Sequence, residues 1–84
     1  MNILIESLYP DDYSAEVVEF KPMVEKDFVI GGNATTNGID WKIVELAEEH
    51  FPNKEYRFYF DSQGPACDIL TNGKVLDKIS IMKD

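Results

Sequence analysis

The dipeptide Asn72-Gly73, with strand-forming residues on both sides, restricts the fold of this 84-residue chain more than any other sequence feature. Both central positions of a two-residue type I′ turn need a positive φ angle, which Asn and Gly adopt more readily than other residues. Residues 69–71 and 74–76 flank the dipeptide and are typical of strands. The sequence therefore predicts a β-hairpin turning at this dipeptide, with its second strand ending near residue 82.

This hairpin would place Asp68 directly opposite Asp77, where like charges destabilise a sheet. A hard divalent cation between the carboxylates, or a basic partner residue, would remove that repulsion. The alternatives are a solvated pair at an exposed edge or a shifted register. We favour these alternatives because Ca²⁺ needs six or more oxygen ligands and the chain has no EF-hand spacing. The sequence therefore predicts no metal and no other cofactor.

Four further segments carry regular patterns. Short apolar runs containing β-branched residues predict strands at 3–8 and 27–30. An apolar stripe, with an aspartate to cap its start and a proline after its end, predicts a helix over 40–51. Aromatic and polar residues alternate at 56–60, which predicts a half-buried strand with Tyr56, Phe58 and Phe60 packed in the core.

Segment 10–20 carries conflicting patterns. A proline followed by two aspartates is typical of a helix start, and Tyr13, Val17 and Phe20 share one helical stripe. A pair of adjacent valines instead favours a strand, which would follow a turn at 9–12. We favour the helix. With it, the sequence predicts an α+β fold in a single domain of residues 1–84, an antiparallel sheet of about five strands with one or two helices on one face.

The balance of charge indicates what kind of partner the chain can bind. Sixteen acidic residues against eight basic ones give a formal net charge of −8. Direct nucleic-acid binding depends on Lys and Arg neutralising phosphates, and anionic membranes likewise attract basic proteins, so neither is expected. The whole excess lies in residues 1–49, which hold eleven acids and three bases. The expected partner is a basic protein surface.

Within this part, acidic residues recur at spacings that bring them onto one face. Glu45 and Glu49 lie one helical turn apart, where like charges repel. Such a set is either the solvated face of an amphipathic element or, in a sharper hypothesis, an imitation of DNA phosphates that fits a groove built for DNA. The candidate partner-binding acids of the two segments are Asp11, Asp12, Glu16, Glu19, Glu45, Glu48 and Glu49.

The first part of the chain also resembles the phage uracil-DNA glycosylase inhibitors, which are small acidic proteins that mimic DNA. The residues that carry the resemblance are Glu6-Ser7-Leu8 at the end of a strand, Pro10-Asp11-Asp12, Glu16-Val17-Val18-Glu19 and Lys21-Pro22. The resemblance implies that Glu6 and Ser7 imitate phosphate contacts. It also implies that Leu8 flanks an apolar pocket for the leucine loop of the enzyme.

The leading hypothesis is a small cytoplasmic inhibitor, phage-encoded, that mimics DNA and blocks a DNA-binding enzyme by stoichiometric binding, with uracil-DNA glycosylase the most concrete target. An immunity or anti-CRISPR-type protein that neutralises a basic nuclease needs the same electrostatics. A hypothesis from a different functional class is a small enzyme or cation-binding module, which would use Asp61, Asp68 and Asp77 as a carboxylate site.

Catalysis is not expected, because neither Cys67 nor His50 has a flanking motif typical of a nucleophile or base. A cysteine in a strand is more often a small buried apolar residue. One histidine and one cysteine cannot supply a zinc site. The lone cysteine and the lack of a long apolar stretch or signal peptide favour an intracellular protein.

Overall fold

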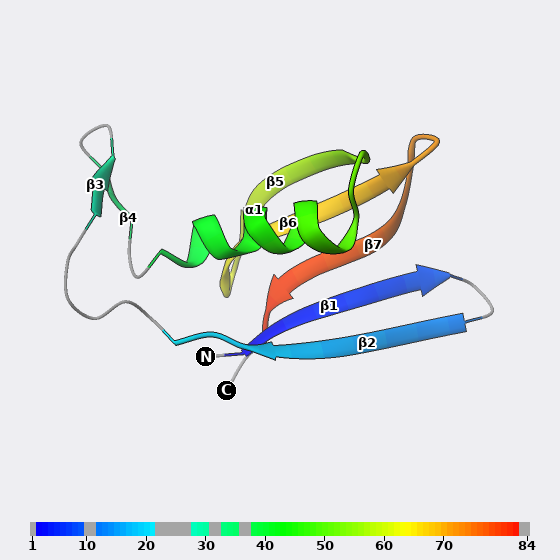
Figure 1. Cartoon of the computed structure of the whole chain (residues 1–84), viewed down its shortest axis with the longest axis horizontal. Helices are drawn as coiled ribbons and strands as arrows, with labels where there is room; N and C mark the ends of the chain where they lie inside the picture. The colour runs from blue at the N-terminus through cyan, green and yellow to red at the C-terminus, as the bar shows by residue number, and fades with distance from the viewer. Residues whose placement is uncertain (1, 10–11, 22–27, 31–32, 36–37, 83–84) are drawn as a thin grey trace.

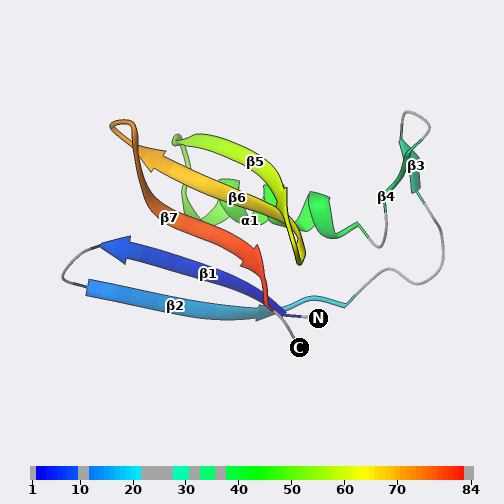
Figure 2. The same ribbon diagram turned by 180° about the vertical axis from the view of Figure 1, so that it is seen from behind.

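The computed structural model describes residues 2–9, 12–21, 28–30, 33–35 and 38–82. In chain order the elements are β1 (Asn2–Tyr9), β2 (Asp12–Glu19), β3 (Phe28–Ile30), β4 (Asn33–Thr35), α1 (Ile39–His50), β5 (Glu55–Asp61), β6 (Gly64–Thr71) and β7 (Lys74–Ile81). Five of the strands form an antiparallel sheet in the order β2-β1-β7-β6-β5, and β3 pairs with β4 in a separate two-stranded sheet. Figures 1 and 2 show α1 lying across one face of the larger sheet. The predicted antiparallel sheet with a helix on one face is confirmed.

The hydrophobic core lies between α1 and the middle of this sheet. Alternation along the strands turns Ile5 of β1, Ile79 of β7 and Cys67 of β6 toward the helix, and the pairing register aligns them in one row. Residues Ile39, Ile43, Leu46 and Ala47 of α1 are buried against this side. The face of the sheet that α1 covers is called the helix side below, and the other is called the open side. No helix of the described residues is long and apolar enough to cross a membrane.

The predicted turn at Asn72-Gly73 is confirmed, because both residues have positive φ angles of 52° and 79°. Thr71 pairs with Lys74 as expected, but the register shifts between Ile69 and Leu70. This bulge places Asp68 opposite Lys78 instead of Asp77. The shifted register, one of the alternatives that the sequence favours, is therefore confirmed, and the alternative of a solvated Asp68–Asp77 pair is wrong, because an opposite-charge pair takes its place.

The helix predicted in segment 10–20 is also wrong, because residues 12–19 form strand β2 along the edge of the sheet. Residues four apart lie on one face in a strand as well as in a helix, so the stripe that contains Tyr13 and Val17 does not separate the two structures. Both side chains are exposed on the open side, and only Val18 and Phe20 pack against the core. The predicted helix over 40–51 is observed as α1, although Gly38 and not an aspartate occupies its N-cap position.

The aromatic residues of β5 are much more exposed than expected. Tyr56 packs against the core, but Phe58 and Phe60 are 50% and 79% exposed. The prediction that all three pack in the core is therefore wrong for the last two. The reason is the position of α1, whose contacts with the sheet fall mainly on β6 and β7 and leave the β5 edge open. Cys67, in contrast, is fully buried, as predicted.

Replacing Gly64 by alanine is expected to destabilise the fold more than replacing Gly73. Both glycines have positive φ angles, but a Cβ at Gly64 would also lie 2.8 Å from Cδ1 of Ile81 in the core, whereas a Cβ at Gly73 would meet no atom. We expect Gly73→Ala to lower the free energy of unfolding by about 1 kcal/mol and Gly64→Ala by about 2 kcal/mol or more. Urea denaturation followed by circular dichroism measures both, and an equal loss would contradict the packing argument.

Candidate functional site

Strand alternation separates the predicted partner-binding residues onto the two faces of the sheet. Glu6, Leu8 and Glu19 lie on the open side, because they alternate with residues that face α1. Ser7 lies on the helix side, together with the β2 residues that share its face, Asp12 and Glu16. The tripeptide Glu6-Ser7-Leu8 is therefore not one continuous surface. Asp11 lies outside the described residues.

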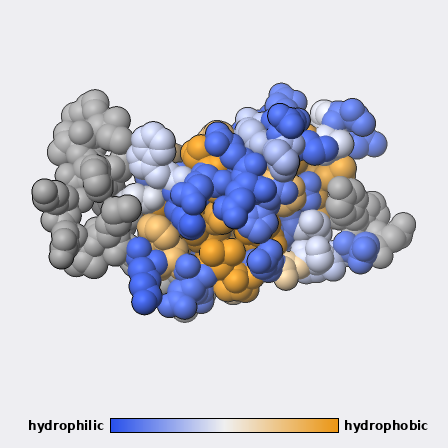
Figure 3. Space-filling view, viewed as in Figure 1, coloured by the Kyte–Doolittle hydropathy of each residue, from blue (hydrophilic) through white to orange (hydrophobic). Residues whose placement is uncertain are grey.

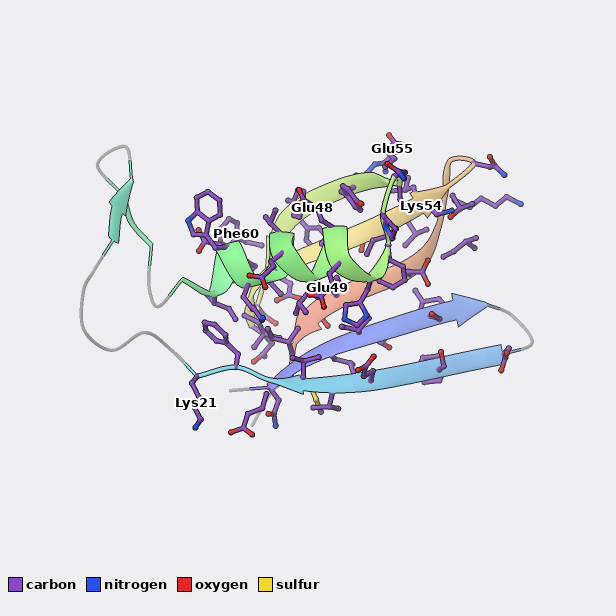
Figure 4. All side chains as sticks on the ribbon, in the orientation of Figure 1. Lys21, Glu48, Glu49, Lys54, Glu55 and Phe60 are labelled. Carbon is purple, nitrogen blue, oxygen red and sulfur yellow. The ribbon has the colours of Figure 1, made fainter. Side chains whose placement is uncertain are left out.

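On the helix side, carboxylates from two separate elements come together. Glu16 of β2 and three residues of α1, Glu45, Glu48 and Glu49, form what we call the acidic ridge, and all four are exposed. His50 of α1 lies near the β2 carboxylate, with its Nδ1 4.0 Å from Oε2 of Glu16. Figure 4 shows Glu49 on the side of α1 nearer β1 and Glu48 on the side nearer β5.

The acidic ridge has few basic neighbours among the described residues. Nζ of Lys42 lies 3.5 Å from Oε1 of Glu45, within the same helix. Apart from this lysine and His50, the ion pairs of the described part of the chain include no basic group at the ridge. Figure 3 shows hydrophilic side chains covering α1, with hydrophobic surface on either side of the helix. The ridge therefore carries a net negative charge at an exposed position, which Lys42 offsets only in part.

A groove of about 360 Å³ runs beside the ridge, between the C-terminal end of α1 and strands β1 and β2. Its lining residues include Ile5, Ser7, Ser14, Glu16, His50 and Phe51. The wall formed by Phe51 is held in place by Tyr56, whose hydroxyl donates a hydrogen bond to the Phe51 carbonyl oxygen. The groove is thus apolar along one wall and acidic at its rim.

A buried carboxylate lies next to this groove. Asp77 is 4% exposed, and the Ser7 hydroxyl donates a hydrogen bond of 2.9 Å to its Oδ1. It is the one buried charged side chain of the described residues. Sequence reasoning missed this pair because the predicted register turned Asp77 toward Asp68, and the bulge instead turns it toward the helix side, where it lies opposite Ile69 and Ser7.

On the open side, four charged residues of alternating sign form a row across the sheet. The pairing register aligns Glu6 of β1, Lys78 of β7, Asp68 of β6 and Arg57 of β5. Opposite charges on neighbouring strands stabilise a sheet modestly, so this row has a structural role. Glu6 is a member of it, although the resemblance assigns it a phosphate-like contact.

Two tyrosine hydroxyls extend this row. That of Tyr13 donates a hydrogen bond of 2.7 Å to Oε2 of Glu6, and this bond is the main reason why the pKa of Tyr13 is raised. The Tyr59 hydroxyl donates a hydrogen bond of 2.9 Å to Oδ1 of Asp68. The pKa of Tyr59 is raised mainly by burial and, to a smaller extent, by this hydrogen bond. The pKa of Lys78 is raised mainly by its hydrogen bond with Tyr59. The two carboxylates of this row, Glu6 and Asp68, are therefore engaged within the protein.

The aspartates of the proposed carboxylate site do not come together. Asp68 and Asp77 lie on opposite faces of the sheet, and Asp61 accepts hydrogen bonds from the backbone N–H groups of Gln63 and Gly64 in the β5–β6 turn. No group of three or more metal-ligating side chains is found within the described ranges 2–9, 12–21, 28–30, 33–35 and 38–82.

The chain was compared with protein-family models, curated proteins and solved structures, and none of them matches it. The interpretation of the site therefore depends on its own geometry and charge.

Ser7→Ala is expected to destabilise the fold, because it leaves a buried carboxylate without its hydrogen-bond donor. We expect the free energy of unfolding to fall by about 1–3 kcal/mol. Ser14→Ala is the matched control, since Ser14 lies directly opposite Ser7 on the same face but is exposed, and it should cost less than about 0.5 kcal/mol. Denaturant titration of both variants measures the difference. Equal effects would contradict the role given to the Ser7–Asp77 bond.

Cys67 is expected to resist alkylation until the protein unfolds. Burial, followed by the nearby charge of Asp68, raises the pKa of its thiol from 9.0 to about 11. Because the folded protein then holds this proton more tightly than the unfolded chain, the free energy of unfolding should fall as the pH rises from 9 to 11. Denaturation at several pH values measures this slope. Cys67→Ala should reduce it, and an unchanged slope would contradict the assignment.

Proposed function

We propose that this protein is a stoichiometric antagonist that binds the basic, DNA-binding surface of an enzyme through the acidic ridge. The observation that carries the proposal is the gathering of carboxylates from β2 and α1 on one exposed face with few basic neighbours. Carboxylates in such a group repel one another, which costs stability in the free protein. A basic partner surface relieves this repulsion and gains from long-range attraction.

The rigid attachment of the ridge favours such a role. Glu45 and Glu49 are one turn apart, so their Cβ atoms lie about 5–6 Å from each other. The opposite side of α1 is buried in the core through residues such as Ile43 and Leu46, which fixes the position of the helix. A binding surface that is ordered before the partner arrives loses less entropy on association than a flexible acidic segment does.

Uracil-DNA glycosylase is the most concrete candidate target, and it comes from the resemblance of the first part of the chain. In this proposal the ridge, not Glu6 and Ser7, makes the phosphate-like contacts, because Glu6 is bonded to Tyr13 and Ser7 to Asp77. Leu8 and Tyr13, which are partly exposed on the open side, remain available for an apolar contact with the partner. If the gene is carried by a phage, the inhibitor acts in the cytoplasm of the host cell.

A basic nuclease bound by an immunity or anti-CRISPR-type protein is a second candidate target, because the same ridge would bind it. The choice between these targets depends on which enzyme is inhibited. An enzymatic role for this chain is not proposed, since Asp61, Asp68 and Asp77 are engaged at three separate places.

Reversing the charge of the ridge is expected to abolish inhibition without unfolding the protein. In a titration against uracil-DNA glycosylase activity, the unmodified chain should inhibit at a one-to-one ratio. Glu45→Lys/Glu49→Lys should weaken binding by roughly tenfold for each reversed residue, with the loss decreasing as salt is added.

Glu55→Lys is the matched control, because Glu55 is equally exposed but lies on β5, at the far edge of the sheet from β2. Glu55→Lys alters the net charge by the same amount as Glu45→Lys alone or Glu49→Lys alone, so it is compared with these single variants. Absence of inhibition at excess protein would remove the glycosylase as a target. Equal weakening by the ridge and control reversals in any target complex would contradict the ridge as the binding surface.

A further inference from the structure

The two edges of the five-stranded sheet differ in how well they are protected from pairing with another strand. An edge strand exposes unpaired backbone N–H and C=O groups, and charged side chains discourage other strands from pairing with them. The β2 edge carries Asp12, Glu16 and Glu19. The β5 edge, with the sequence EYRFYFD, also carries three charged residues, but they are of both signs and stand among four aromatic residues, so a second copy of the same strand can pair with it.

The helix-side aromatic residues at the β5 edge form an exposed apolar patch. Phe58 and Phe60 are 50% and 79% exposed, and Trp41 of α1 is 61% exposed. A groove of about 240 Å³ between β5 and α1 is lined in part by Phe58, Phe60, Val44 and Pro65. Figure 4 shows Phe60 close to the N-terminal end of α1. Such a patch beside an unpaired edge strand is typical of an interaction surface.

We infer that the occupant of this edge is a second copy of the chain, bound by antiparallel pairing of β5 with β5 of its partner. The sequence of β5 selects one register for a two-fold symmetric pair. With the axis at Tyr59, Phe58 lies opposite the partner's Phe60, and Arg57 lies opposite the partner's Asp61. The same two pairs recur on the other side of the axis, so the contact contains two aromatic pairs and two opposite-charge pairs.

Neighbouring registers lack this complementarity. An axis at Arg57 would bring two guanidinium groups together, and an axis at Phe58 would place Glu55 opposite the partner's Asp61. Arg57 lies opposite Asp68 in the charged row, but no carboxylate of the described residues lies within ion-pair distance of it, so its guanidinium group can reach across to a partner. Asp61 uses Oδ1 for the β5–β6 turn, which leaves Oδ2 for the arginine.

The dimer has consequences that distinguish it from binding through the acidic ridge. It joins two sheets into one of ten strands and leaves both ridges free, because β5 and β2 lie at opposite edges. Each chain has a formal charge of −8, so the copies repel at long range and added salt should strengthen the dimer. Binding of a basic partner through the ridge should respond to salt in the opposite direction.

Sedimentation equilibrium over a range of protein concentrations tests this inference. The unmodified chain should form dimers, and Arg57→Asp or Asp61→Arg alone should weaken the dimer by about tenfold or more, because each creates two like-charge pairs. An equimolar mixture of the two variants should recover a one-to-one heterodimer, since both charge pairs are then complementary. Lys74→Asp, which changes the charge of an exposed residue at the start of β7 by the same amount, is the control and should dimerise normally.

Phe60→Glu keeps the inference testable if Asp61→Arg damages the turn, because the Phe60 side chain is almost fully exposed in a single copy. It should abolish the dimer while the protein stays folded and still binds a partner through the ridge. A chain that remains monomeric at every concentration would overturn the inference. So would a Phe60→Glu dimer as tight as the unmodified one, or two folded charge variants that do not associate when mixed.

Discussion

The β-bulge between Ile69 and Leu70 determines how the central strands of this protein are aligned. Without it, the turn at Asn72-Gly73 would bring two aspartates into direct opposition. With it, Asp68 lies opposite Lys78, and Asp77 turns toward Ser7. A single extra residue in β7 thus separates two aspartates that would otherwise repel each other. Asp68 joins the charged row on the open side, and Asp77 becomes a buried, hydrogen-bonded carboxylate on the helix side.

The same alignment positions the candidate binding surface. The isoleucine side chains that the register aligns on β1, β7 and β6 form the surface against which α1 packs. Because these side chains lie at the centre of the sheet, α1 covers β6 and β7 and leaves both edges partly uncovered. One uncovered edge, β2, places Glu16 near His50 of α1 and completes the acidic ridge. The other edge, β5, exposes aromatic residues.

Local patterns in the sequence predict the fold well where one turn or one amphipathic stripe determines the structure. The turn at Asn72-Gly73 and helix α1 are of this kind. The sequence favours a helix in place of strand β2 because residues such as Tyr13 and Val17, four positions apart, share a face in either structure. Only the backbone of β1, which β2 pairs along its whole length, decides between them.

The candidate site was harder to predict, because its parts come together through long-range alignment. The sequence identifies Glu45, Glu48 and Glu49 as one exposed acidic face, and the structure joins Glu16 to them. Alternation in the predicted strand already places Glu6 and Ser7 on opposite faces, but the sequence does not reveal the partners that engage them there, Tyr13 and Asp77. The burial of Asp77 depends on the bulge, which no local residue pattern marks.

If the acidic ridge occupies a protein surface built for DNA, this chain and DNA cannot bind that surface at the same time. Competition between duplex DNA and this chain for one enzyme tests this exclusion most directly. Host proteins retained on the immobilised chain should be DNA-binding enzymes, and a short DNA duplex should release them in proportion to its concentration. A column carrying Glu45→Lys/Glu49→Lys should retain none of them. Retention that is unaffected by duplex DNA, or that is equal on both columns, would contradict this role of the ridge.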